Sequence, residues 1–278
     1  MRSRLLSLSV RWVACLLALG CLAQSRVPGS PALEQLSPEQ GQAYLTGFRA
    51  SRLNGDLCVR FEIVHKPRQG ESKAPVLGTL WIGARGSSQL LRGEIKDAHD
   101  KPVFAFLTVK SGEESRVWIS RQGAAAQELV SQSPLLPLAE GLLLSPFDLQ
   151  LPFTHWAATA YLGTERRRRP VHVFDALNQV GREPAKVNFA IDSVYGVLIQ
   201  ASCFDAEGKK TRTTQVEEFT KVEDQWMLAA CSVRDEATRD ADLLRITEAA
   251  LGERFQPETF NPSTLAAPAP QPTNFKKL

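Results

Sequence analysis

Apolar and polar side chains alternate along most of this chain in short runs, separated by segments rich in glycine, proline, aspartate and serine. Such segments favour turns or tolerate positive φ, and an alternation with period two places apolar side chains on one face of a strand. The first five runs are DLCVRFEIVH, VLGTLWIGA, QLLRGEIK, PVFAFLTVK and SRVWISR. They predict consecutive antiparallel strands.

The same pattern resumes after residue 157. The later runs are ATAYLGTE, RPVHVFDAL, AKVNFAIDSVYGVLIQASCFD, KTRTTQVEEFTKV and QWMLAACSV, and RDADLLRITEAALGERF predicts a strand followed by a short helix. No strand-to-helix alternation of the βαβ kind appears. The predicted fold class is therefore mainly β, within α+β: one large, curved antiparallel sheet or unclosed β-barrel with few helices.

One predicted strand is apolar on both faces. In residues 103–109, Val103, Ala105 and Leu107 alternate with Phe104 and Phe106. A sheet with two dry faces needs a cover on each side.

Two segments carry helix-start signals. Ser37, Pro38 and Gln40 form a capping box with proline at the first helical position. In LLLSPFDLQLPFTHW, residues 142–156, Ser145, Pro146 and Asp148 repeat this arrangement. Pro152 limits that helix to about two turns. It presents five large apolar side chains: Phe147, Leu149, Leu151, Phe153 and Trp156. They either plug the sheet or form a lid over a ligand cavity.

The amino terminus predicts export. Residues 1–23 combine arginines with an apolar core from Trp12 to Ala23, which is shorter than the ~20 residues of a membrane span. Cleavage after Ala23 and lipidation at Cys21, within ALGC, remain two alternatives. The mature protein is expected to be periplasmic, or anchored to a membrane as a lipoprotein.

Residues 24–34 are predicted to be a linker, residues 35–264 a single domain, and residues 265–278 a disordered tail rich in proline and alanine. Cys203 and Cys231 fall on strands two apart in one meander, at about 9 to 10 Å, which is beyond the reach of a disulfide. We expect them and Cys58 to be buried thiols.

Composition and motifs indicate no catalytic site. The net charge of +3, with acids and bases interspersed, does not favour nucleic-acid binding. Nucleophile elbows, phosphate loops and paired metal-ligand motifs are absent, and Asp97, His99 and Asp100 lack a second ligand cluster. The expected protein is not an enzyme and needs no cofactor and no metal.

Three stretches carry a family resemblance: LGTLWIGARG, LSPFDLQLPFTHWAATAYLGTERRRRPVHVFDAL and VLIQASCFDAEGKKTRTTQVEEFTKVEDQWML. With these, residues 36–262 resemble the LolA-like outer-membrane lipoprotein-sorting family. The resemblance implies helices packed across the concave face of an unclosed barrel, enclosing a cavity for acyl chains. It favours the lid interpretation and implies a carrier of lipid or lipoprotein acyl chains near the outer membrane.

The alternative that the resemblance implies is an envelope regulatory or scaffold module that binds a membrane-protein partner. Trp81 and Trp118 are further candidates for the cavity wall, whereas Trp226 is predicted to pack at a sheet edge. The run ERRRR, residues 165–169, departs from the family's ordinary turn. It is either a site for lipid phosphates or a solvated hairpin tip that protects the sheet edge, and we favour the tip.

Overall fold

One antiparallel sheet organises the chain from Leu33 to Leu278. The computed structural model describes residues 33–50, 55–72, 74–97, 102–112, 114–129, 135–222 and 225–278. The predicted signal peptide with Cys21, the linker up to residue 32, His99 and Asp100 lie outside the described residues.

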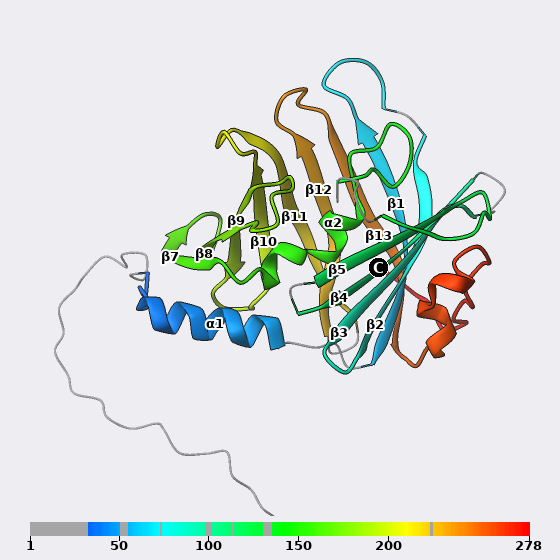
Figure 1. Ribbon diagram of the computed structural model, residues 1–278, viewed down its shortest axis with the longest axis horizontal. Helices are drawn as coiled ribbons and strands as arrows, with labels where there is room; N and C mark the ends of the chain where they lie inside the picture. The colour runs from blue at the N-terminus through cyan, green and yellow to red at the C-terminus, as the bar shows by residue number, and fades with distance from the viewer. Residues whose placement is uncertain are drawn as a thin grey trace, which may run out of the picture. The chain divides into compact units, whose positions relative to one another are not determined.

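Figure 1 shows the strands of this sheet and the helices that accompany them. The strands are β1 (Asp56–Lys66), β2 (Val76–Arg85), β3 (Ser88–Lys96), β4 (Pro102–Ser111), β5 (Glu114–Arg121), β6 (Gln127–Glu128), β7 (Thr159–Arg166), β8 (Pro170–Leu177), β9 (Lys186–Asp192), β10 (Leu198–Phe204), β11 (Lys210–Val222), β12 (Gln225–Asp235), β13 (Ala241–Glu253) and β14 (Lys276–Lys277). Each predicted strand run coincides with one of these strands or, in the longest run, with two.

Neighbouring strands follow the order of the chain with one exception. The order is β6-β5-β4-β3-β2-β1-β13-β12-β11-β10-β9-β8-β7, so that β1 pairs with β13, while β14 adds to β13. The edges β6 and β7 do not pair with each other, and the sheet remains unclosed. The predicted fold class is confirmed.

The helices are α1 (Pro38–Ala50), α2 (Pro146–Gln150) and the short 3-10 helices η1 (Pro152–His155), η2 (Pro257–Phe260) and η3 (Pro262–Thr264). The predicted capping box of α1 is present, because the Ser37 backbone N–H donates to Gln40 Oε1 at 2.8 Å. Among the described residues, no helix is long and apolar enough to cross a membrane.

Both faces of β1 to β5 are covered, as the apolar pattern of β4 predicted. On one face, Val59 and Phe106 belong to a core that includes Leu138 and Leu144, from residues 135–156, here called the cover segment. On the other face, Leu107 belongs to a core that includes Phe260, Leu265 and Ala269, from residues 255–278, here called the C-terminal segment. Figure 1 shows the C-terminal segment in orange and red beside β1 to β3.

The prediction of a disordered tail is wrong. Leu265 and Ala269 are buried against the sheet, and Lys276–Lys277 form β14. Trp81 Nε1 donates to Pro270 O at 2.9 Å. Proline and alanine pack here because β2 to β4 present a second apolar face that must be shielded from water.

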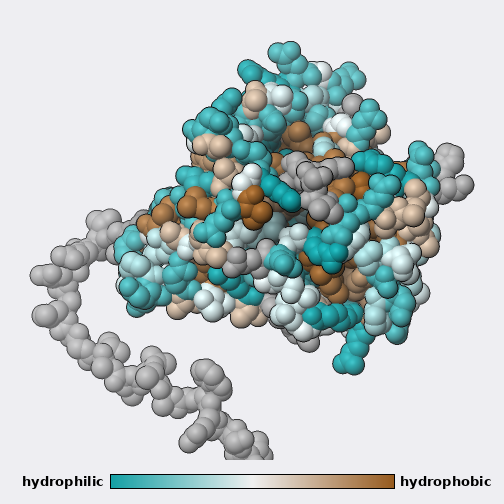
Figure 2. Space-filling view, viewed as in Figure 1, coloured by the Kyte–Doolittle hydropathy of each residue, from teal (hydrophilic) through white to brown (hydrophobic). Residues whose placement is uncertain are grey.

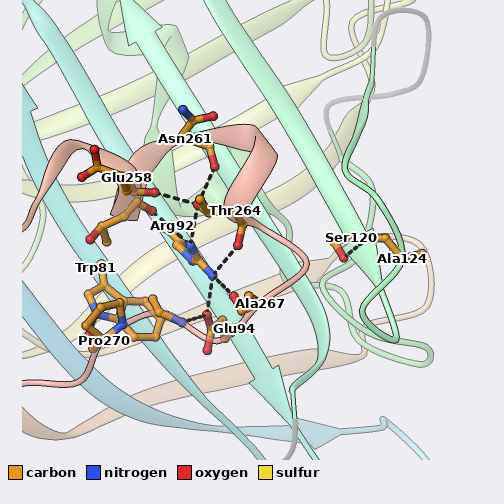
Figure 3. A network of polar contacts seen from close by, with 12 residues as sticks. Trp81, Arg92, Glu94, Ser120, Ala124, Glu258, Asn261, Thr264, Ala267 and Pro270 are labelled. Atoms are coloured by element: carbon orange, nitrogen blue, oxygen red, sulfur yellow. Dashed lines mark hydrogen bonds and ion pairs between the residues drawn. The ribbon is translucent and has the colours of Figure 1, made fainter.

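A buried ion pair extends this contact. Arg92 donates to Glu94 Oε1 at 2.8 Å, to Thr259 O at 3.2 Å and to Ala267 O (Figure 3). Glu94 Oε1 also accepts the backbone N–H of Ala269 at 2.8 Å. The C-terminal segment therefore supplies partners that two buried charges on β3 require.

Two smaller predictions need correction. The segment predicted to end in a short helix continues as strand β13 to Glu253, and the helical turn η2 follows only at Pro257. Trp226 lies where β12 pairs with β11 alone, since the pairing of β12 with β13 begins at Ala230, but its side chain is largely exposed and does not pack there as predicted.

Candidate functional site

The cover segment crosses one face of the sheet, with α2 in front of the strands in Figure 1. Figure 2 shows hydrophobic side chains gathered around the middle of the same face. Phe147 and Phe153 are buried, whereas Leu149, Leu151 and Trp156 are partly buried. All five predicted apolar side chains therefore lie in or beside the core of this face.

The helix start at Ser145 forms as predicted. The Asp148 carboxylate, which completes this capping box, also binds the sheet. Asp148 Oδ2 accepts the Ser145 N–H at 2.9 Å and lies 2.8 Å from Arg212 Nη2 on β11. Asp148 Oδ1 accepts the Thr214 hydroxyl at 3.0 Å. Arg212 donates in addition to Leu143 O. Because Asp148 is buried, removing its charged partner would leave an uncompensated charge.

A second carboxylate holds the cover segment from the sheet side. Asp242 on β13 is fully buried, and its Oδ2 accepts the backbone N–H groups of Leu143 and Leu144 at 2.6 and 2.8 Å. Its Oδ1 lies 2.8 Å from His65 Nδ1. The cover segment is thus joined to β11 and β13 by polar contacts at its centre.

Aromatic rings fill the space between α2, η1 and strands β8 and β9. The Phe153 ring lies 5.7 Å from that of Phe147 and 5.4 Å from that of Phe189. Phe189 stacks on Phe174 at 5.3 Å. Leu151 adopts positive φ, which ends α2 and turns Pro152–His155 back toward the sheet. The space beneath the cover, here called the trough, is filled by the packed rings of Phe147, Phe153, Phe174 and Phe189.

Helix α1 closes the side of the trough. Arg49 Nε donates to Thr154 O at 2.6 Å, and Arg49 Nη2 donates to Trp156 O at 3.1 Å. Gly41 lets α1 approach β7, because a Cβ at this position would lie 2.2 Å from the ring of Tyr161. Both helices therefore shield the same aromatic core.

Polar side chains also contact α2 and η1 from strands β4 and β5. Lys110 Nζ lies 2.9 Å from His155 Nδ1, and the Ser115 hydroxyl donates to Gln150 Oε1. Gln150 Nε2 and Thr108 Oγ1 are buried without a hydrogen-bond partner among the described residues. Unpartnered buried polar atoms are uncommon in native proteins and indicate a place where a further polar group can bind.

The structure does not bring every predicted wall residue to this trough. Trp81 and Trp118 belong to the core of the opposite face, under the C-terminal segment, so their prediction as cavity residues is wrong. Trp81 lies between Leu80 and Ile82, which face the cover, and strand alternation therefore turns it away.

Sequence reasoning also missed Arg212, Thr214 and Asp242. For Arg212 and Thr214, the available signal was a charge and a hydroxyl inside the strand run KTRTTQV. A charged residue on a strand that becomes buried needs a partner, because charged residues are rarely buried unless paired.

The described residues contain no group of three or more metal-ligating side chains. The three described cysteines are free and buried, as predicted. Burial raises the pKa of Cys203 and of Cys231 to about 12, so neither thiol is ionised near neutral pH.

Comparison with known proteins identifies the fold. No family model matches the sequence, and no curated protein matches it. An outer membrane lipoprotein-sorting protein domain from Vibrio parahaemolyticus is similar in structure, with a TM-score of 0.72 at 15% identity, over 83% of this chain and 100% of that chain.

Two further solved structures share the architecture. A DUF1329 family protein from Desulfovibrio piger has a TM-score of 0.71 at 11% identity, over 82% of this chain and 98% of its own. A LolA superfamily protein from Nitrosomonas europaea has a TM-score of 0.57 at 12% identity, over 80% of this chain and 97% of its own. The chain therefore has a LolA-like fold, as its resemblance implied.

Proposed function

We propose that this chain, with its LolA-like fold, is an exported, non-catalytic carrier that binds acyl chains of lipids or lipoproteins beneath the cover segment. It acts in the periplasm or at the outer membrane, where acyl chains must be shielded from water. The observation that carries this proposal is an aromatic trough whose cover takes no part in the sheet and is joined to it by apolar packing and a few polar contacts.

Simple magnitudes favour displacement of this cover by a long acyl chain. Burial stabilises each methylene by about 0.8 kcal/mol, so a long chain contributes on the order of 10 kcal/mol. Breaking a buried ion pair such as Asp148 with Arg212 costs about 3 to 5 kcal/mol when one partner is left buried, and less when both move into water. Opening also removes apolar contacts of the cover, such as those of Phe147 and Phe153, so binding offsets the opening only where the acyl chain replaces these contacts.

The polar contacts of α2 and η1 support a ligand with a polar group beside its chain. Gln150 Nε2 and Thr108 Oγ1 are donors without an acceptor, and Lys110 is buried next to them. The carbonyl oxygen of an ester or amide at the head of an acyl chain supplies the missing acceptor. The similarity to a lipoprotein-sorting domain also supports acylated ligands.

The test is displacement of a fluorescent fatty acid. Trp156→Asp and Phe153→Asp place a charge in the trough and should weaken binding at least tenfold, whereas Leu177→Asp, on an exposed part of β8, should leave binding unchanged. Circular dichroism and urea unfolding identify any variant that fails to fold.

A second variant changes binding in the opposite direction. Thr214→Val removes one hydrogen bond to Asp148, worth about 1 kcal/mol, and should tighten apparent affinity by up to about fivefold because the cover opens more readily. Binding that neither Trp156→Asp nor Thr214→Val alters would contradict the proposal. Purification of a membrane-protein partner with no bound lipid would favour the scaffold function instead.

A further inference from the structure

Exposed apolar side chains gather at one end of strands β7 to β12, outside the trough. Val194 and Tyr195, at the β9–β10 turn, are 70% and 51% exposed, and Trp226, at the start of β12, is 55% exposed. The rings of Tyr195 and Trp226 lie 6.1 Å apart. These three residues, here called the apolar tip, come from two hairpins and form one surface.

The turn that presents the apolar tip is held rigidly. Asp192 Oδ1 accepts the backbone N–H groups of Val194 and Tyr195, each at 2.8 Å. The Tyr44 hydroxyl of α1 donates to Asp192 O at 2.6 Å. Gly196 supplies the positive φ that the turn needs. Two large apolar side chains are thus fixed in an exposed position, where water contact is unfavourable.

Arginines from the β7–β8 hairpin adjoin the apolar tip. The guanidinium of Arg169 lies 4.3 Å from the centre of the Tyr195 ring, and its Nε lies 2.9 Å from Asp192 Oδ2. Arg168 is exposed and makes no ion pair with the described residues. The carboxylates nearby are Asp192, Glu165 and Glu217, which the four arginines of residues 166–169 outnumber.

A cavity of about 260 Å³ opens between these elements. Val197, Ile199 and Phe219 line it together with the aromatic pair, and so do Arg168, Arg169, Asp192 and Glu217. Arg169 is paired with Asp192, whereas Arg168 adds a cation to a largely apolar wall. Such a cavity matches a molecule that has a hydrocarbon part next to an anionic group.

We propose that the apolar tip, the cavity and Arg168 with Arg169 dock the protein onto a bilayer that contains anionic phospholipid. Arginine binds phosphate oxygens through parallel N–H groups, and tryptophan and tyrosine are enriched at the level of lipid headgroups. Lipid phosphates contact the guanidinium groups, and the upper part of one acyl chain enters the cavity. This docking surface is distinct from the trough and does not depend on its function.

Vesicle sedimentation tests the proposal with a chain that begins at Gln24, so that acylation at Cys21 cannot contribute. Wild-type protein should bind vesicles of phosphatidylglycerol with phosphatidylcholine, bind vesicles of phosphatidylcholine alone much less, and dissociate at high salt. Arg168→Glu and Trp226→Ser change exposed side chains and should each weaken binding about tenfold. Their urea unfolding midpoints should match the wild type.

Matched controls lie at the other end of the same strands. Val180→Ser and Arg182→Glu, in the β8–β9 connection, should sediment like wild type. Failure of wild-type protein to bind phosphatidylglycerol vesicles would overturn the proposal and assign the tip to a protein partner. An equal loss of vesicle binding in the control variants would also overturn it, because binding would then not depend on this particular surface.

Discussion

Three buried carboxylates join irregular segments to the sheet. Glu94 binds the C-terminal segment, Asp242 binds the cover segment, and Asp148 binds β11 from within the cover segment. Apolar contact has no direction, whereas a carboxylate with fixed donors specifies one position. These residues therefore determine where each segment lies on its face.

His172 is another buried polar residue, on β8 beside the trough. Its ring centre lies 4.5 Å from that of Tyr44 and 5.9 Å from that of Tyr161, and its Nδ1 lies 3.1 Å from the Thr164 hydroxyl. Burial lowers the pKa of His172, and the charge of Glu34 opposes this shift in part. The folded protein therefore favours neutral imidazole.

We predict a loss of stability when His172 is protonated. A lowered pKa means that the unfolded chain binds the proton more readily below pH about 6.5, so the contribution is complete above that pH and is lost as pH falls toward the folded-state pKa. The free energy of unfolding, measured in urea between pH about 7 and 5, should fall less steeply in His172→Gln than in the wild type. Identical slopes for the two proteins would contradict this prediction.

At the scale of elements, the strands were predictable because alternation and turn chemistry are local. The helix starts at Ser37 and Ser145 were also predictable, since a cap and its partner lie three residues apart. Which segment covers which face of the sheet could not be predicted in this way, because it depends on contacts between residues far apart in the chain. The β4 pattern required two covers, but it did not say that the proline-rich tail would supply one of them.

The sequence of β3 carried an indication that a further segment covers this face of the sheet. Arg92 and Glu94 share the face of β3 that carries Leu90, and two charges on a face that also carries apolar residues require polar partners. Backbone carbonyl groups of the C-terminal segment accept from Arg92, whereas the backbone N–H of Ala269 donates to Glu94. Composition alone could not distinguish this use from disorder.

The C-terminal segment should therefore contribute to global stability. Leu265→Asp buries a charge without a partner and should lower the free energy of unfolding by more than about 3 kcal/mol, with increased binding of a hydrophobic dye. Gln271→Asp adds the same charge at an exposed position of that segment and should change stability by less than about 0.5 kcal/mol. Equal unfolding midpoints in urea would show that the segment is dispensable.

At the scale of the whole described unit, one sheet links two cores on the same face. The β1 and β13 pairing joins the halves, with Val59 opposite Ala249, and aromatic packing under the cover lies on the β8–β9 side. The cover segment spans both cores, because Leu144 belongs to one and Phe147 to the other. Motion of this one segment would expose apolar surface of both halves while the ladder of the sheet stays intact.

Amide hydrogen exchange can distinguish motion of the cover segment from motion of the sheet. The amides of Leu143 and Leu144 are held by Asp242 Oδ2 of the sheet. If an acyl chain displaces the cover, these amides lose their acceptors and should exchange faster in the complex than in the free protein. Backbone amides of the β1–β13 ladder, such as that of Val59, keep their partners and serve as the internal control. Unchanged or slower exchange at Leu143 and Leu144 with a saturating ligand would place the ligand elsewhere, because the trough cannot be entered while both amides remain bonded to β13.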